Sequence, residues 1–79
     1  SIDTSTTSPM LNVPFNIEFK PPENKKSLAI ILGGIENPLI QEVSNEKVEV
    51  TPTRIGKMRI ILISFNPISI TRKTIEVRV

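Results

Sequence analysis

Few side chains in this sequence of 79 residues could carry out chemistry, because it contains no His and no Cys. The commonest general base, the thiol nucleophile and the usual zinc, copper and haem ligands are therefore missing. Hydroxyl groups of Ser and Thr remain, but an active Ser needs a base oriented by a third group, and here only Lys could act as that base. We expect no nucleophile–base motif in this segment and therefore no enzyme activity of its own.

The sequence also predicts no metal and no cofactor. Asp3, the only Asp, lies in a polar leader, and the Glu residues are scattered singly, without a calcium-binding loop of the D-x-[DN]-x-[DN]-G type. Gly33 and Gly34 follow an apolar run, but the phosphate-binding patterns G-x-x-x-x-G-K-[ST] and G-x-G-x-x-G are both missing. These two glycines therefore predict a turn.

Composition predicts a single globular domain without a nucleic-acid partner. Hydrophobic residues make up 38% of the chain, charged residues 23%, and the formal net charge is +2, a surplus too small to predict binding to nucleic acid. The chain has no Trp or Tyr, and its three Phe occupy predicted core positions rather than base-stacking positions. No apolar run approaches the length of a membrane span.

Short apolar segments separated by turns predict an all-β domain. Phe15, Ile17 and Phe19 alternate with polar residues, whereas residues 27–32 form a continuous apolar run of the length expected for a strand buried on both faces. No window shows a helical apolar stripe, and Ile and Val dominate the apolar set. We predict strands at 13–19, 27–32, 39–43, 48–51, 58–65 and 74–79.

The two ends of this pattern lead to separate expectations. Residues 1–10 are rich in Ser and Thr and lead to Pro9, so we expect a mobile linker there and place the domain at residues 11–79. Ile68 and Ile70 fall on the opposite alternation phase from Ile75 and Val77. We therefore expect a bulge or loop near Arg72 and Lys73.

The sequence predicts a corner just before the strand at 58–65. Residues 52–57, with Pro52 and Gly56, suit a chain that crosses from one sheet to the other, since Gly tolerates positive φ without cost. The spacing of Gly56, Met58 and Ile60 resembles the G-x-Y-x-C stretch of the sixth strand in immunoglobulin-like sandwiches, with Met and Ile in place of Tyr and Cys. This resemblance implies an immunoglobulin-like Greek-key sandwich of six or seven antiparallel strands.

In a sandwich of this type, the connections after the second and sixth strands lie at one end. Residues 20–26 would then lie beside residues 66–73, and the turn at 44–47 would join them. This arrangement predicts a basic pole that could bind an acidic protein face, a phospholipid surface or an acidic surface polymer. The residues of the predicted pole are Lys20, Lys25, Lys26, Lys47, Arg72 and Lys73.

These observations predict a non-catalytic spacer or an adhesion and interaction module of a larger exported or cell-surface protein, with neighbouring domains in the same chain. Immunoglobulin-like modules serve as spacers, adhesion units and accessory domains, so the fold alone does not choose among them. One alternative is an accessory domain appended to a catalytic, hydrolase-like domain. Another is an assembly subunit that exchanges strands at an open sheet edge.

Overall fold

Seven antiparallel strands and one short 3-10 helix make up the computed structural model, which describes residues 1–79. Six of the strands lie close to the predicted segments, although the last one starts at Ser69 rather than at residue 74, and one additional strand comes from the N-terminal segment. Their bounds are β1 Ile2–Thr4, β2 Phe15–Phe19, β3 Ser27–Leu32, β4 Leu39–Val43, β5 Glu46–Val50, β6 Gly56–Ser64 and β7 Ser69–Val77, with η1 at Pro22–Asn24 between β2 and β3.

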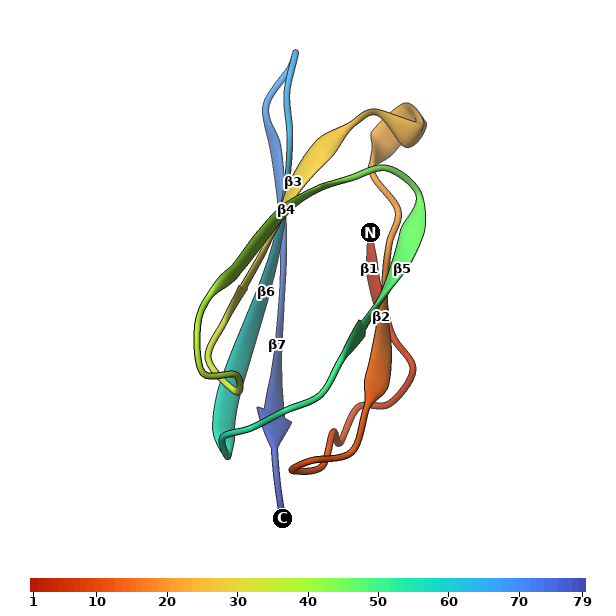
Figure 1. Cartoon of the computed structure of the whole chain (residues 1–79). Coiled ribbons are helices and arrows are strands. Elements are labelled where there is room, and N and C mark those ends of the chain that lie inside the picture. The colour runs from red at the N-terminus through yellow and green to blue at the C-terminus, as the bar shows by residue number, and fades with distance from the viewer.

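The strands form two sheets that face each other (Figure 1). The first sheet has three strands in the order β1-β2-β5, and the second has four in the order β4-β3-β6-β7. The molecule is elongated along its strands, with extents of 39 × 19 × 16 Å. We call the end with η1, the β4–β5 turn and the β6–β7 turn the upper end, and the end where the C-terminus emerges the lower end.

The core lies between the two sheets, where alternate residues of each strand point inward. Phe19, Ile17 and Met58 are completely buried, and Ile60 from β6 packs in the same layer. The 13 core residues are all apolar and come from all seven strands. Because the chain has no disulfide, this one apolar layer supplies most of the stability.

Glycine conformations confirm the predicted turns. Gly56 opens β6 with φ at +116°, and a Cβ there would meet nothing within 4 Å, so the residue serves the backbone rather than the packing. At Gly33, φ is +83° and a Cβ would come within 2.3 Å of the carbonyl oxygen of Lys57. The chain can make this close approach at the end of β3 only because Gly33 has no side chain.

The expectation of a mobile linker at residues 1–10 is wrong for much of that segment. Residues 2–4 form β1, which pairs with β2, and the side chain of Ile2 is buried in the core. Pro9 is buried as well, and Met10 forms a parallel bridge with Arg78 beyond the end of β7. A single Ile opposite Phe19 is enough to dock this edge strand, although the segment is mostly polar.

Two expectations about burial and regularity also need correction. The β3 segment is not buried on both faces, since Leu28 and Ile30 are only half-buried and Leu32 is exposed. β7 has no bulge: all nine of its residues from Ser69 to Val77 pair in unbroken register with β6. The change of phase near Arg72 arises because Ile70 packs on the outward side of the sheet, whereas Ile75 and Val77 face the core.

The single helix, η1, spans three residues, and no helix here is long and apolar enough to cross a membrane.

Candidate interaction surfaces

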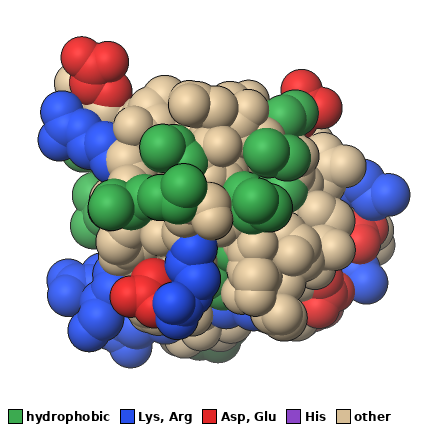
Figure 2. Space-filling model, turned by 90° about the horizontal axis from the view of Figure 1, so that it is seen from below, with side chains coloured by type: hydrophobic (Ala, Val, Ile, Leu, Met, Phe, Trp, Pro, Cys, Tyr) green, Lys and Arg blue, Asp and Glu red, His purple; other side chains and the backbone are tan.

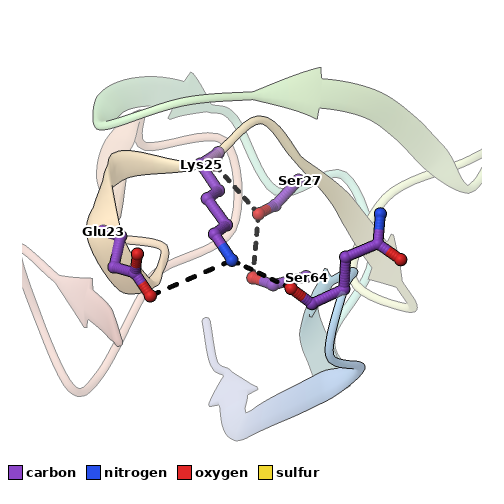
Figure 3. A network of polar contacts seen from close by, with 5 residues as sticks. Glu23, Lys25, Ser27 and Ser64 are labelled. Atoms are coloured by element: carbon purple, nitrogen blue, oxygen red, sulfur yellow. Dashed lines mark hydrogen bonds and ion pairs between the residues drawn. The ribbon is translucent and has the colours of Figure 1, made fainter.

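The upper end is held together by a polar network between the two connections that the sequence placed there (Figure 3). Lys25 Nζ donates a hydrogen bond to the backbone oxygen of Asn66 at 3.0 Å and lies 3.9 Å from a carboxylate oxygen of Glu23. Below it, the Ser27 hydroxyl donates to the Lys25 carbonyl and lies 2.8 Å from the Ser64 hydroxyl. These contacts confirm that the connections after β2 and β6 are neighbours.

The serine pair in this network stabilises the fold rather than forming a nucleophilic centre. Ser27 and Ser64 are each 3% exposed, and their hydroxyls contact each other and a backbone carbonyl. Neither hydroxyl bonds to a Lys or a carboxylate side chain, so nothing positions a proton acceptor for either one. The pair satisfies polar groups where β3 and β6 meet the upper end.

The chain does contain one S-x-x-K spacing, from Ser44 to Lys47, contrary to the expectation of no such motif. In the structure it is not a nucleophile–base pair. The two residues lie across the turn between β4 and β5, where the Ser44 amide donates to the Glu46 carboxylate at 2.9 Å. No hydrogen bond joins Ser44 to Lys47, which belongs to β5 and lies beside Glu18.

The six residues of the predicted basic pole lie in three different places. Lys25 and Lys26 lie in the upper connection, and Lys20, the first residue of that connection, is paired at 3.1 Å with Asp3 and at 3.7 Å with Glu18. The hydrogen bond that Lys20 donates to Asp3, reinforced by the nearby charge of Glu18, raises the pKa of Lys20 above its ordinary value of 10.5. The positive charge of Lys20 is therefore already balanced by carboxylates of the same chain.

Lys47 lies on the outward side of the three-stranded sheet, directly opposite Glu18 in the register. Both residues line a hollow of about 180 Å³ that has no hydrophobic lining residue. Asp3 also lines this hollow, and its carboxylate and that of Glu18 are offset by Lys47 and by Lys20, which pairs with both of them. This surface does not extend the basic pole.

Arg72 and Lys73 lie within β7 rather than in the upper connection, because β7 begins at Ser69. They pair with Ile61 and Ile60 of β6 and line a second hollow of about 350 Å³ together with Arg59. The sequence placed them too close to the upper end because their strand starts earlier than the predicted 74–79. Only Lys25 and Lys26 remain of a basic pole there, and Glu23 opposes one of them.

A different surface stands out, which the sequence did not predict as a site. The outward side of the four-stranded sheet, here called the outer face, is largely aliphatic and no layer covers it. On this side Ile40 is 62% exposed, Ile70 47% and Leu32 37%, while Leu28 and Ile61 are among its half-buried members. An uncovered antiparallel sheet face is normally polar, and a contiguous apolar one marks an interaction site.

The strand register arranges the aliphatic part of the outer face in three cross-strand rows, and a fourth row, Lys57-Glu76, continues the face toward the lower end. Each row runs from the β4 side to the β7 side and joins residues that lie directly opposite one another. The rows are Ile40-Ile30-Ile61-Arg72, then Glu42-Leu28-Ile63-Ile70 on the side toward the upper end, and Leu32-Arg59-Thr74 on the side toward the lower end.

Charges occupy two opposite corners of this aliphatic field. Glu42 stands at one corner, on β4. Arg59 and Arg72 flank Thr74 at the diagonally opposite corner, on β6 and β7. None of these three charged residues takes part in an ion pair within the chain, whose pairs all involve other residues.

A sequence signal for the outer face existed in the two continuous apolar runs at 27–32 and 60–63. In an antiparallel sheet such runs place apolar residues on both faces. The run at 27–32 predicted a strand covered on both sides, but the fold has only two layers, so one side of each strand stays uncovered.

The lower end carries a second, smaller group of apolar side chains (Figure 2). Hydrogen bonds bring together the segments that form this end, from Asn12 to Pro52 and from Thr53 to Gly34. Exposed apolar residues on these segments are Met10, Val13, Ile55 and Val79. Val13, the first residue of the predicted strand 13–19, lies outside β2 and is about half exposed.

Comparisons of the chain with protein-family models, with curated proteins and with solved structures gave no match.

Proposed function

We propose that this chain is a non-catalytic interaction module with an immunoglobulin-like Greek-key fold, and that it binds another protein through its outer face. The strand order supports the fold assignment: the first, second and fifth strands form one sheet, and the third, fourth, sixth and seventh form the other. Met58 and Ile60, which replace the usual Tyr and Cys of the sixth strand, both lie fully buried in the core.

The single observation that carries the proposal is the aliphatic outer face. Exposing Ile40, Ile70 and Leu32 on one side of a sheet, next to further half-buried Ile and Leu, costs solubility and does nothing for the core. A partner surface that covers these side chains removes the cost and gains hydrophobic stabilisation. The unpaired charges at its corners supply orientation, since charged groups at an interface set register more than affinity.

A place in a larger exported or cell-surface protein is part of the same proposal. The module is long and narrow, and its first residue lies beside Lys20 near the upper part of the molecule while Val79 leaves from the lower end (Figure 1). This arrangement suits a spacer in a row of domains.

The apolar lower end favours a second candidate, an accessory domain that packs against a catalytic domain of the same chain. Met10 bridges to Arg78 and accepts a hydrogen bond from Val13, and Ile55 precedes Gly56, which pairs with Val77. A domain that follows Val79 would therefore contact these exposed side chains. In this case the lower end, rather than the outer face, is the surface that the parent protein covers.

Site-specific photo-cross-linking in the intact parent protein tests the proposed function. A photoreactive residue at Ile40 samples the outer face, one at Ile55 samples the lower end, and one at Glu49, exposed on the outward side of the three-stranded sheet, is the control. We expect protein adducts from position 40 and none from position 49. Adducts from position 55 alone support the accessory domain, and equal yields at 40 and 49 contradict a binding role for the outer face.

A further inference from the structure

We propose that the partner of the outer face is a second copy of this chain, bound face to face about a two-fold axis. The inference deepens the proposed function and rests on it. It follows from the positions of three charged residues, Glu42, Arg59 and Arg72, at the edges of the aliphatic field.

The first step is the geometry of the corners. Glu42 and Thr74 are separated by the full width of four strands and by two rows, which is about 14 Å across the strands and about 13 Å along them. The line from the acidic corner to the basic corner therefore runs at about 45° to the strands. The perpendicular diagonal, at the same angle to the strands, passes through the centre of the aliphatic field.

The second step is the symmetry. A two-fold axis along that second diagonal, in the plane between two stacked faces, exchanges the acidic corner with the basic one. Glu42 of each copy then faces Arg59 and Arg72 of the other, at both ends of the interface. The rotation turns the strands of one copy by about 90° relative to the other, which is one of the two established ways in which β-sheets pack face to face.

The third step is the chemistry of the contact. Stacked sheets lie about 10 Å apart, a gap that one Arg and one Glu side chain span together. Between the two ionic clusters, the central Ile30 and Ile61 meet the same residues of the other copy. A second copy of this chain therefore provides both an apolar surface and opposite charges in the required positions. An unrelated partner would need the same apolar surface and the same placement of charges.

The size of the face sets the expected strength. Four strands and three rows cover a projected area of about 400 Å², which is small beside the roughly 800 Å² per partner of a standard interface. We therefore expect a weak dimer, with a dissociation constant in the micromolar range or above. Such a contact becomes significant where copies are held close together, as on a surface or in a tandem array.

Charge-exchange variants test the symmetry directly by sedimentation velocity, from micromolar to millimolar concentration. Glu42→Arg and the double variant Arg59→Glu/Arg72→Glu alter only exposed positions, so circular dichroism should show an intact fold. Each variant alone places like charges opposite each other at both corners, and we expect its dimer dissociation constant to rise at least about tenfold. Glu49→Arg, an equal charge change on the other sheet, should leave dimerisation unchanged.

Mixing the two charge variants is the decisive step. In the mixed dimer, the arginine introduced by Glu42→Arg faces the two glutamates introduced by Arg59→Glu/Arg72→Glu. At the other corner, the native Glu42 of the double variant faces the native Arg59 and Arg72 of the Glu42→Arg chain. We expect association to return to the wild-type strength. A monomeric wild type at all concentrations, or a mixture that stays monomeric, overturns the proposal.

Three further outcomes contradict the face-to-face dimer and show separately whether the proposed function holds. If the wild type dimerises and every charge variant has the same dissociation constant, the result points to strand exchange at a sheet edge and overturns the face-to-face arrangement. A monomeric chain whose position 40 cross-links to a different protein refutes the dimer alone. A monomeric chain without any adduct at position 40 refutes both the dimer and the binding role of the outer face.

Discussion

At the residue scale, the buried serine pair makes a sharp prediction about stability. Ser27→Ala leaves the Ser64 hydroxyl buried without its partner, and we expect the free energy of unfolding to fall by about 1–3 kcal/mol. The double variant Ser27→Ala/Ser64→Ala removes both polar groups, so its loss should be smaller than the sum of the two single losses. Urea unfolding measures all three variants, and strictly additive losses would show that the hydroxyls do not depend on each other.

Lys20 predicts a dependence on alkaline pH. Its pKa is raised by its hydrogen bond to Asp3 and by the charge of Glu18, so its folded pKa exceeds the unfolded value. The resulting stabilisation is fully present below the unfolded pKa and is lost as the pH rises through the raised folded value. We therefore expect the wild type to melt above Lys20→Met at neutral pH, with the difference vanishing well above pH 10.5. If the difference in melting temperature between the wild type and Lys20→Met does not depend on pH, the effect comes from the methylene groups of Lys20 rather than from its charge.

At the element scale, β1 illustrates how a polar segment can be part of the fold. Ile2 fills a core position opposite Phe19, and removing most of its side chain leaves a cavity beneath the sheet edge. We expect Ile2→Ala to lower the free energy of unfolding by about 2 kcal/mol. Thr7→Ala, at an exposed position in the same N-terminal segment, is the matched control and should change little. If a denaturant titration gives the two variants equal stability, Ile2 does not contribute to the core and residues 1–10 act as a linker.

At the scale of the whole molecule, the core between the sheets and the outer face have opposite roles, which two substitutions separate. Phe19 is completely buried in the single core, so we expect Phe19→Ala to cost about 3–5 kcal/mol, much of the stability of a chain this small. Ile40→Lys changes a side chain on the outer face and should alter the free energy of unfolding by less than about 0.5 kcal/mol.

The same Ile40→Lys variant should also reduce binding of a hydrophobic dye and raise solubility, because it breaks the aliphatic field. Chemical unfolding and dye fluorescence measure the two properties on the same samples. A large loss of stability in Ile40→Lys would mean that the outer face belongs to the core after all, and would remove the basis for a binding role.

Local patterns in the sequence determined the all-β class, the position of most strands and the conformation of Gly56. Alternation at Phe15, Ile17 and Phe19 and the Gly pair after β3 are signals that lie within a few neighbouring residues, so they can be interpreted without the rest of the chain. Topology predicted that residues 20–26 and 66–73 are neighbours; the contact from Lys25 to Asn66 confirms this for the start of the second segment, whereas Arg72 and Lys73 lie within β7.

Only the tertiary structure decided which apolar runs are covered and which charges are paired. Whether Leu28, Ile61 and Ile70 meet a second layer depends on the number of layers, which no local pattern encodes. Lys20 appeared free in the sequence because Asp3 is distant along the chain and reaches it only when β1 docks on β2. Both outcomes depend on contacts between distant segments, and for this reason the outer face, rather than a basic pole, is the surface that the folded molecule presents.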